Sequence, residues 1–198
     1  MRCFVTALLL AALSLPAFSA GELSNRRAPG FALPDVNVNY HDLADYRGKV
    51  VLLDILQTSC PVCGSSQRIF ETIRQKFPDK VQILSVVVPP DNQNTVRQFM
   101  QGFGIKTPIL FDCGQMVGAY LKLTPQKPQA TFPHLFLIDG NGWIRNDFVY
   151  GPAMEKYFEG LEPLLTEVTA LVKELPVGGV KPVAGPAAPP AQPAAGKK

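Results

Sequence analysis

The sequence predicts an α/β fold, a three-layer sandwich in which helices flank a central mixed β-sheet. Runs of apolar and β-branched residues alternate along the chain with segments whose apolar residues recur at helical spacing. A strand–turn–strand pattern and a last amphipathic stretch follow these segments. Strands that alternate with helices and end in a hairpin and a helix are typical of a mixed sheet with helices packed on it.

The first half of this fold is expected to hold three strands and two helices. Residues 31–40 resemble an irregular strand or hairpin arm, and the continuous apolar run at 49–56 predicts a strand buried on both faces. Helical spacing predicts a helix over 61–77, and residues 81–88 predict a second buried strand. Apolar residues at i, i+3, i+4 and i+7 then predict one helix face: Val96, Phe99, Met100 and Phe103.

The second half is expected to end in a hairpin and a helix. Its expected elements are a short strand (108–112), a short helix (116–121), two hairpin strands (134–138 and 143–149) and a final helix (154–172) interrupted near Pro163. The Asp-Gly-Asn-Gly segment at 139–142 is typical of the turn that joins two such strands.

Residues 1–20 are typical of a secretory signal peptide. Arg2 precedes an apolar run from Phe4 to Leu15, and small residues follow it. The run is shorter than the roughly 20 residues that a membrane-spanning helix needs. We therefore expect cleavage near Ala20 and a periplasmic or otherwise extracytoplasmic location, with retention of the leader as an anchor as the alternative.

Composition excludes several functional classes. The chain has 19 Lys and Arg against 16 Asp and Glu residues, and this charge of +3 is too small and too scattered to indicate binding of nucleic acid or an anionic membrane.

Residues 25–174 suffice for one domain, and the Pro/Ala-rich tail at 175–198 is expected to be disordered. Without Cys3, which lies in the leader, three cysteines remain, and they do not describe a disulfide-stapled scaffold.

Cys60-Pro61-Val62-Cys63 stands between a predicted buried strand and a predicted helix. Pro61 is well suited to the first turn of a helix, so Cys60 is expected at the helix N-terminus. Free N–H groups and the helix dipole favour the thiolate form of a cysteine there. Cys63, one turn further on, lies on nearly the same face and can close a disulfide with Cys60.

With these features in order, the chain resembles the exported TlpA/ResA-type thiol-disulfide oxidoreductases, thioredoxin-fold members of the redoxin/AhpC-TSA superfamily. The resemblance covers roughly residues 25–174. It rests on the Gly48–Leu53 run, the CxxC motif, an additional strand and helix between Lys80 and Phe103, the Phe132–Asp139 segment and the Gly140–Gly142 turn. It implies a thioredoxin-like sandwich with an N-terminal extension and an inserted β–α element, and an enzyme that uses no cofactor.

Two residues match positions that this family uses beside its cysteines. Asp54, six residues before Cys60, occupies the place of the buried acid that assists proton transfer to and from the inner thiol. A carboxyl group in an apolar strand is costly unless it is paired or has a raised pKa, so Asp54 is a functional candidate; a strand-end acid that faces solvent is the alternative. Pro133 matches the cis-proline opposite the CxxC motif, with a trans proline at a strand start as the alternative.

Around the nucleophile the chain departs from the family. Thr58-Ser59 stand where the family usually has Trp or another aromatic residue before the first cysteine. Phe132 is bulkier than the usual Thr or Val before the proline and is expected to narrow the groove there. The residues expected to line the substrate groove are Ser59, Pro61, Val62 and Phe132.

The resemblance implies a catalytic set of Cys60, Cys63, Asp54 and Pro133. In the reduced protein Cys60 attacks a substrate disulfide, and Cys63 resolves the mixed disulfide while Asp54 helps to remove its proton. The implied partners are thiols or disulfides of exported proteins, including apocytochromes before haem attachment, and a membrane electron donor. The protein is expected to act as a monomer, and the direction of exchange depends on the reduction potential rather than on the fold.

Two other classes of function remain as alternatives to this one, with a redox-inactive binding domain as a weaker third. A peroxiredoxin carries Pro-x-x-x-Thr-x-x-Cys, whereas this chain has Leu53 and Gln57 at the corresponding positions. A copper carrier of the same fold spaces its cysteines by three residues and adds a suitably placed His; His134 is instead expected to be a strand residue. Cys113 has no ligand-like partners nearby in the sequence, so no metal site is expected there. A small buried residue at a strand end is favoured for Cys113 over a resolving thiol or a site for mixed disulfides.

Overall fold

The computed structural model describes residues 21–176. The predicted leader and nearly all of the predicted tail lie outside this range, so the expectations for them stay predictions. Within residues 21–176, no helix is both long enough and apolar enough to cross a membrane.

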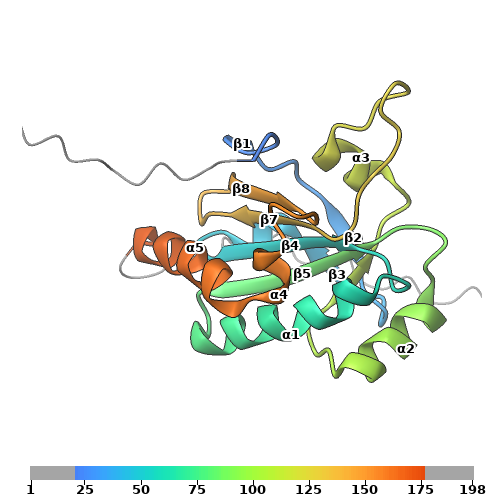
Figure 1. Cartoon of the computed structure of the whole chain (residues 1–198), viewed down its shortest axis with the longest axis horizontal. Coiled ribbons are helices and arrows are strands. Elements are labelled where there is room, and N and C mark those ends of the chain that lie inside the picture. Colours follow the sequence, from blue (N-terminus) through green and yellow to red (C-terminus); the bar gives the residue numbers. More distant parts are fainter. Residues whose placement is uncertain (1–20, 177–198) are drawn as a thin grey trace, which may run out of the picture.

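A six-stranded mixed sheet forms the centre of the fold, in the order β1-β8-β7-β4-β5-β6 (Figure 1). Its strands are β1 (Arg26–Arg27), β4 (Val50–Leu56), β5 (Val81–Val87), β6 (Ile109–Phe111), β7 (His134–Ile138) and β8 (Trp143–Val149). Parallel pairing joins β4, β5 and β6, whereas antiparallel pairing joins β4, β7, β8 and β1. Where an irregular strand or hairpin arm is predicted, β2 (Ala32–Pro34) pairs with β3 (Tyr40–Asp42), and the short 3-10 helix η1 (Leu43–Tyr46) follows.

Helices cover both faces of this sheet, which confirms the predicted three-layer sandwich (Figure 1). The helices are α1 (Pro61–Lys76), α2 (Gln93–Phe103), α3 (Gln115–Leu121), α4 (Lys156–Glu159) and α5 (Leu161–Glu174). Residues of α1, α4 and α5 pack into one hydrophobic layer, and those of α3 pack into the layer on the opposite face. A third cluster joins α2 to the start of α1 and to the last residues of β4 and β5.

Both main layers are built on β4. Val50 and Leu52 pack with α1 and α5, whereas Val51, Leu53 and Ile55 pack with α3. All seven residues of the strand are buried, because packed layers cover both of its faces and β5 and β7 pair with its two edges. Burial on both faces explains why this segment is a continuous apolar run, interrupted by a single acid.

The break in the last helical region lies at Gly160 and not at Pro163. Gly160 has an extended backbone (φ −118°, ψ 131°) between the end of α4 and the start of α5. Pro163 falls within the first turn of α5, where an N–H group has no intrahelical acceptor and the proline ring removes no bond. The predicted break at Pro163 is therefore wrong, because a proline is compatible with the first turn of a helix.

Packing between α1 and α2 gives a prediction for Gly64. A Cβ added to Gly64 would come within 2.2–2.4 Å of the ring atoms of Phe103. We expect Gly64→Ala to lower the free energy of unfolding by about 1–2 kcal/mol, although Ala is the better helix former. The control is Gly102→Ala in α2, where the added Cβ meets nothing within 4 Å and a gain of about 0.5–1 kcal/mol is expected. Equal gains for both variants in chemical denaturation would contradict this packing.

Candidate active site

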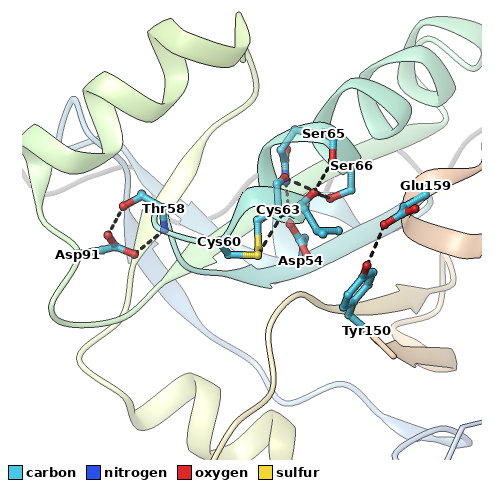
Figure 2. The surroundings of a disulfide bond; sticks show 11 residues. Asp54, Thr58, Cys60, Cys63, Ser65, Ser66, Asp91, Tyr150 and Glu159 are labelled. Atoms are coloured by element: carbon cyan, nitrogen blue, oxygen red, sulfur yellow. Dashed lines mark hydrogen bonds between the residues drawn. A yellow bond between two sulfur atoms is a disulfide. The ribbon is translucent and has the colours of Figure 1, made fainter. Parts of the chain in front are cut away.

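Cys60 and Cys63 form a disulfide at the start of α1, with an S–S distance of 2.32 Å and a Cα–Cα distance of 5.4 Å (Figure 2). Cys60 is the N-cap residue of the helix and Pro61 occupies its first turn, as the sequence predicts. Cys60 is half-buried, whereas Cys63 has no exposed surface. An incoming disulfide can therefore reach the first sulfur, and the second is shielded behind it.

The helix terminus provides an electrostatic setting for a thiolate at Cys60. The backbone N–H of Cys63 donates a hydrogen bond to the Cys60 Sγ atom at 3.2 Å. The first turn of α1 carries no acidic residue that would oppose a negative charge there. Free N–H groups and the helix dipole stabilise a thiolate at this position, which is the property that a nucleophilic cysteine needs.

Asp91 holds the loop that precedes Cys60, a role that the sequence pattern does not predict. Its carboxylate accepts hydrogen bonds from the Thr58 backbone N–H at 2.9 Å and from the Thr58 hydroxyl. The hydroxyl of Thr95, in the first turn of α2, donates to the same carboxylate at 3.1 Å. Asp91 thus ties the loop before Cys60 to the start of α2. Figure 2 shows its two hydrogen bonds to Thr58.

Asp54 lies in β4 on the α1 side of the sheet and is completely buried, beside the cysteine pair (Figure 2). Its Oδ2 atom accepts a hydrogen bond from Nε2 of Gln67 at 2.7 Å, and its Oδ1 atom has no hydrogen-bond partner among the described residues. Burial raises the pKa of Asp54 from its ordinary value of 3.8 to about 8, and the bond from Gln67 opposes part of this rise. The alternative of a strand-end acid that faces solvent is wrong.

Gln67 is a second residue that the sequence pattern did not single out. It follows Cys63 by one helical turn and is buried against the sheet. A glutamine within an amphipathic helix gives no signal of its own. The pairing of β4 with β5 places Ser85 opposite Asp54. These two buried polar side chains need a hydrogen-bond partner between them, and Gln67 is that partner.

Pro133 follows Phe132, which packs in the same hydrophobic cluster as Cys60. The Phe132–Pro133 peptide bond is cis, the conformation that the resemblance implies, and Pro133 is buried. Phe132 is half-buried and packs against the same hydrophobic cluster as Cys60. Of the other residues expected to line the groove, Ser59 and Pro61 are exposed and Val62 is half-buried. All four residues expected in the groove have exposed surface, and their contact with substrate stays a prediction.

His134 lies in β7 and is turned away from the Asp54 side of the sheet. Its ring stacks on Phe136 with centroids 4.6 Å apart, and Nε2 lies 3.5 Å from Oδ2 of Asp147. The side chain is buried and lines a cavity of about 350 Å³ next to the N-terminal segment. These contacts agree with the prediction that His134 is a strand residue.

Cys113 is an exposed free thiol, so the expectation of a small buried residue is wrong. β6 ends at Phe111, and the chain turns to the surface before α3 begins. The buried position falls instead to Asp112, whose carboxylate accepts the backbone N–H groups of Met116 and Val117 at 3.2 and 2.9 Å. Within residues 21–176 no group of three or more His, Cys, Asp or Glu side chains is placed to hold a metal ion.

The sequence is similar to those of proteins named thiol-disulfide oxidoreductases. The Redoxin family profile matches residues 23–159. Thiol-disulfide oxidoreductase ResA of Geobacillus thermodenitrificans (strain NG80-2) is 32% identical over 156 residues, which cover 73% of this chain and 83% of the relative. Thiol-disulfide oxidoreductase ResA of Geobacillus kaustophilus (strain HTA426) is 32% identical over 145 residues, which cover 69% of this chain and 76% of the relative.

Solved structures agree on the fold. A putative thiol:disulfide interchange protein DsbE from Chlorobium tepidum matches with a TM-score of 0.61 and 24% identity, over 75% of this chain and 97% of its own. A putative thioredoxin from Neisseria meningitidis matches with a TM-score of 0.55 and 27% identity, over 73% of this chain and 93% of its own. The chain therefore belongs to the redoxin family and is a thioredoxin-fold thiol-disulfide oxidoreductase of the ResA-like type.

Proposed function

We propose that this protein works outside the cytoplasm and reduces disulfides of exported proteins through the Cys60/Cys63 couple. The observation that carries the proposal is the asymmetry of the pair, in which a half-buried sulfur caps α1 and a fully buried sulfur stands behind it. The buried carboxyl group of Asp54 on the same side of the sheet supplies a group that can take up a proton near pH 8. The predicted leader at 1–20 supports export.

The proposed reaction moves two electrons from the dithiol to the substrate. The Cys60 thiolate attacks a substrate disulfide, a Cys60–substrate disulfide forms, and the first substrate sulfur leaves as a thiolate. Cys63 then loses its proton to the Asp54 carboxylate and attacks the Cys60 sulfur, and the second substrate sulfur leaves. The protein ends as the Cys60–Cys63 disulfide seen in the structure, and a membrane electron donor returns it to the dithiol.

Substrate contacts are assigned by the same proposal to the surface around Cys60. The exposed Ser59 and Pro61 and the half-buried Val62 and Phe132 would contact the polypeptide that carries the disulfide. The backbone before the cis Pro133 would offer strand-like hydrogen bonds to it. Apocytochrome c before haem attachment is the substrate that the family resemblance favours. The protein would act on it as a monomer.

The site supports this function better than either alternative. A peroxiredoxin would need a threonine three residues before the nucleophile, where this chain has Gln57. A copper carrier would need a histidine turned to the cysteines, whereas His134 stacks on Phe136 and faces Asp147. Tight stoichiometric copper binding that is lost in His134→Ala would restore the carrier as the better explanation.

Substitution of each cysteine tests the roles proposed for them. With insulin as the substrate and dithiothreitol as the reductant, we expect Cys60→Ser to fall to the uncatalysed rate, because it removes the nucleophile. Cys63→Ser should accumulate a mixed disulfide on Cys60, visible on a non-reducing gel. Cys113→Ser, the control at the exposed thiol, should turn over like the parent. Turnover that survives Cys60→Ser would contradict the assignment.

The raised pKa of Asp54 predicts how stability depends on pH. Below about pH 4 the carboxyl group holds its proton in both folded and unfolded chains, and between about pH 4 and pH 8 only the unfolded chain ionises. Asp54 therefore lowers the free energy of unfolding as the pH rises through this window. Asp54→Asn should remove this loss, so the advantage of the variant over the parent should grow by roughly 1.4 kcal/mol per pH unit within the window.

Chemical denaturation of the oxidised protein at a series of pH values measures this difference. The Asn side chain can keep the hydrogen bond to Gln67, which makes Asp54→Asn a matched replacement. A constant difference between variant and parent from about pH 4 to pH 8 would show that the carboxyl group titrates normally.

A further inference from the structure

Asp54, Gln67 and Ser85 form a buried chain of hydrogen bonds behind the cysteine pair. Nε2 of Gln67 donates to Oδ2 of Asp54 at 2.7 Å, and the Ser85 hydroxyl donates to Oε1 of Gln67 at 3.3 Å. All three side chains are buried, and Gln67 is 3% exposed. Because β4 and β5 are parallel with Asp54 opposite Ser85, both side chains stand on the face that α1 covers.

We propose that Gln67 is a positioning residue for disulfide exchange, which holds Oδ2 of Asp54 and leaves Oδ1 as the oxygen that exchanges a proton with Cys63. This inference rests on the proposed function and adds a residue to it. Oδ1 is buried and has no hydrogen-bond partner among the described residues, so it is the carboxyl oxygen open to a new bond. Ser85 fixes the amide, because its hydroxyl occupies Oε1 and turns Nε2 to the acid.

The division between the two oxygens suits both protonation states of Asp54. In the resolving step the S–H bond of Cys63 breaks, its proton passes to Oδ1, and the Cys63 sulfur displaces the substrate sulfur from Cys60. Oδ2 accepts the Gln67 N–H both before and after this transfer, because a carbonyl oxygen and a carboxylate oxygen are each acceptors. The bond is stronger to the charged form, so Gln67 favours the carboxylate that receives the proton.

Charged groups near the cysteine pair do not set the ionisation of Asp54. On α1, Glu71 is paired with Arg74 at 2.6 Å, and at the other side of the pair Tyr150 donates to Glu159 at 2.8 Å (Figure 2). The strands that flank Asp54 present Ser85 and Leu135 opposite it. Burial and the Gln67 bond are the influences that act on its ionisation, and none of the charged groups just named contributes. The amide is therefore the feature to change.

The test follows the resolving step in the full chain carrying Cys113→Ser. Ellman's reagent reacts with the reduced protein to place thionitrobenzoate on Cys60, and Cys63 then releases a second thionitrobenzoate, whose rate is measured by stopped-flow absorbance from about pH 5 to pH 10. The variant is Gln67→Leu, which keeps the bulk of the side chain and removes the amide. Gln75→Leu, the same change on the exposed side of α1, is the matched control.

We expect Gln67→Leu to shift the pH profile of the second release to higher pH and to slow it about tenfold at pH 7, because a hydrogen bond to a charged group changes an ionisation equilibrium by about this factor. At high pH the rate should return to that of the parent, and Gln75→Leu should match the parent throughout. In an Asp54→Asn background, Gln67→Leu should cause no further slowing.

Three results would overturn the inference: an unchanged profile, an equal loss at every pH, or further slowing in the Asp54→Asn background. If Gln67→Leu does not fold, as judged by circular dichroism, Ser85→Ala takes its place, with a shift in the same direction expected and an unchanged profile contradicting the inference. A parent that never releases the second thionitrobenzoate would instead contradict the proposed function itself, so the two failures are distinguishable.

Discussion

The pairing of β4 between β5 and β7 is the constraint on which the site depends. In this central position the layers on the two faces of the sheet bury every residue of β4, including the carboxyl group of Asp54. The strand ends directly before the loop that leads to Cys60. Burial of an acid without a charged partner favours its neutral form, and this gives a group that can exchange protons near physiological pH. Residues of the same strand pack into both main hydrophobic layers. A change in β4 would therefore affect both the stability of the fold and the chemistry of the site.

The N-terminus of α1 and the hydrogen bonds of Asp91 position the two sulfur atoms. The N-terminus of α1 holds Cys60 where backbone N–H groups favour a thiolate, and the first helical turn carries Cys63 inward to full burial. Asp91 fixes the preceding loop through Thr58 and links it to the start of α2. Cys60 is thus held by a helix end and a tied loop, an arrangement that would position a reacting sulfur well.

Much of this could be predicted from the sequence, because the strongest signals are local. A continuous apolar strand, a CxxC motif and a helix that starts with proline lie within about 30 residues of one another, and an acid in an apolar strand indicates a perturbed group. Gln67 could not be predicted, since its partner Ser85 is set by strand register. Cys113 was placed wrongly because the pattern does not show that β6 ends early and that Asp112 takes the buried position.

The central claim is that the Cys60/Cys63 couple acts as a reductant, and its reduction potential tests this most directly. Equilibration of the Cys113→Ser protein with glutathione or dithiothreitol buffers, followed by quantitation of free thiols, measures it. We expect a value on the order of −270 mV or lower, as for thioredoxin. A value of about −120 mV would mean that the couple donates its disulfide to substrates, and would contradict the proposed direction.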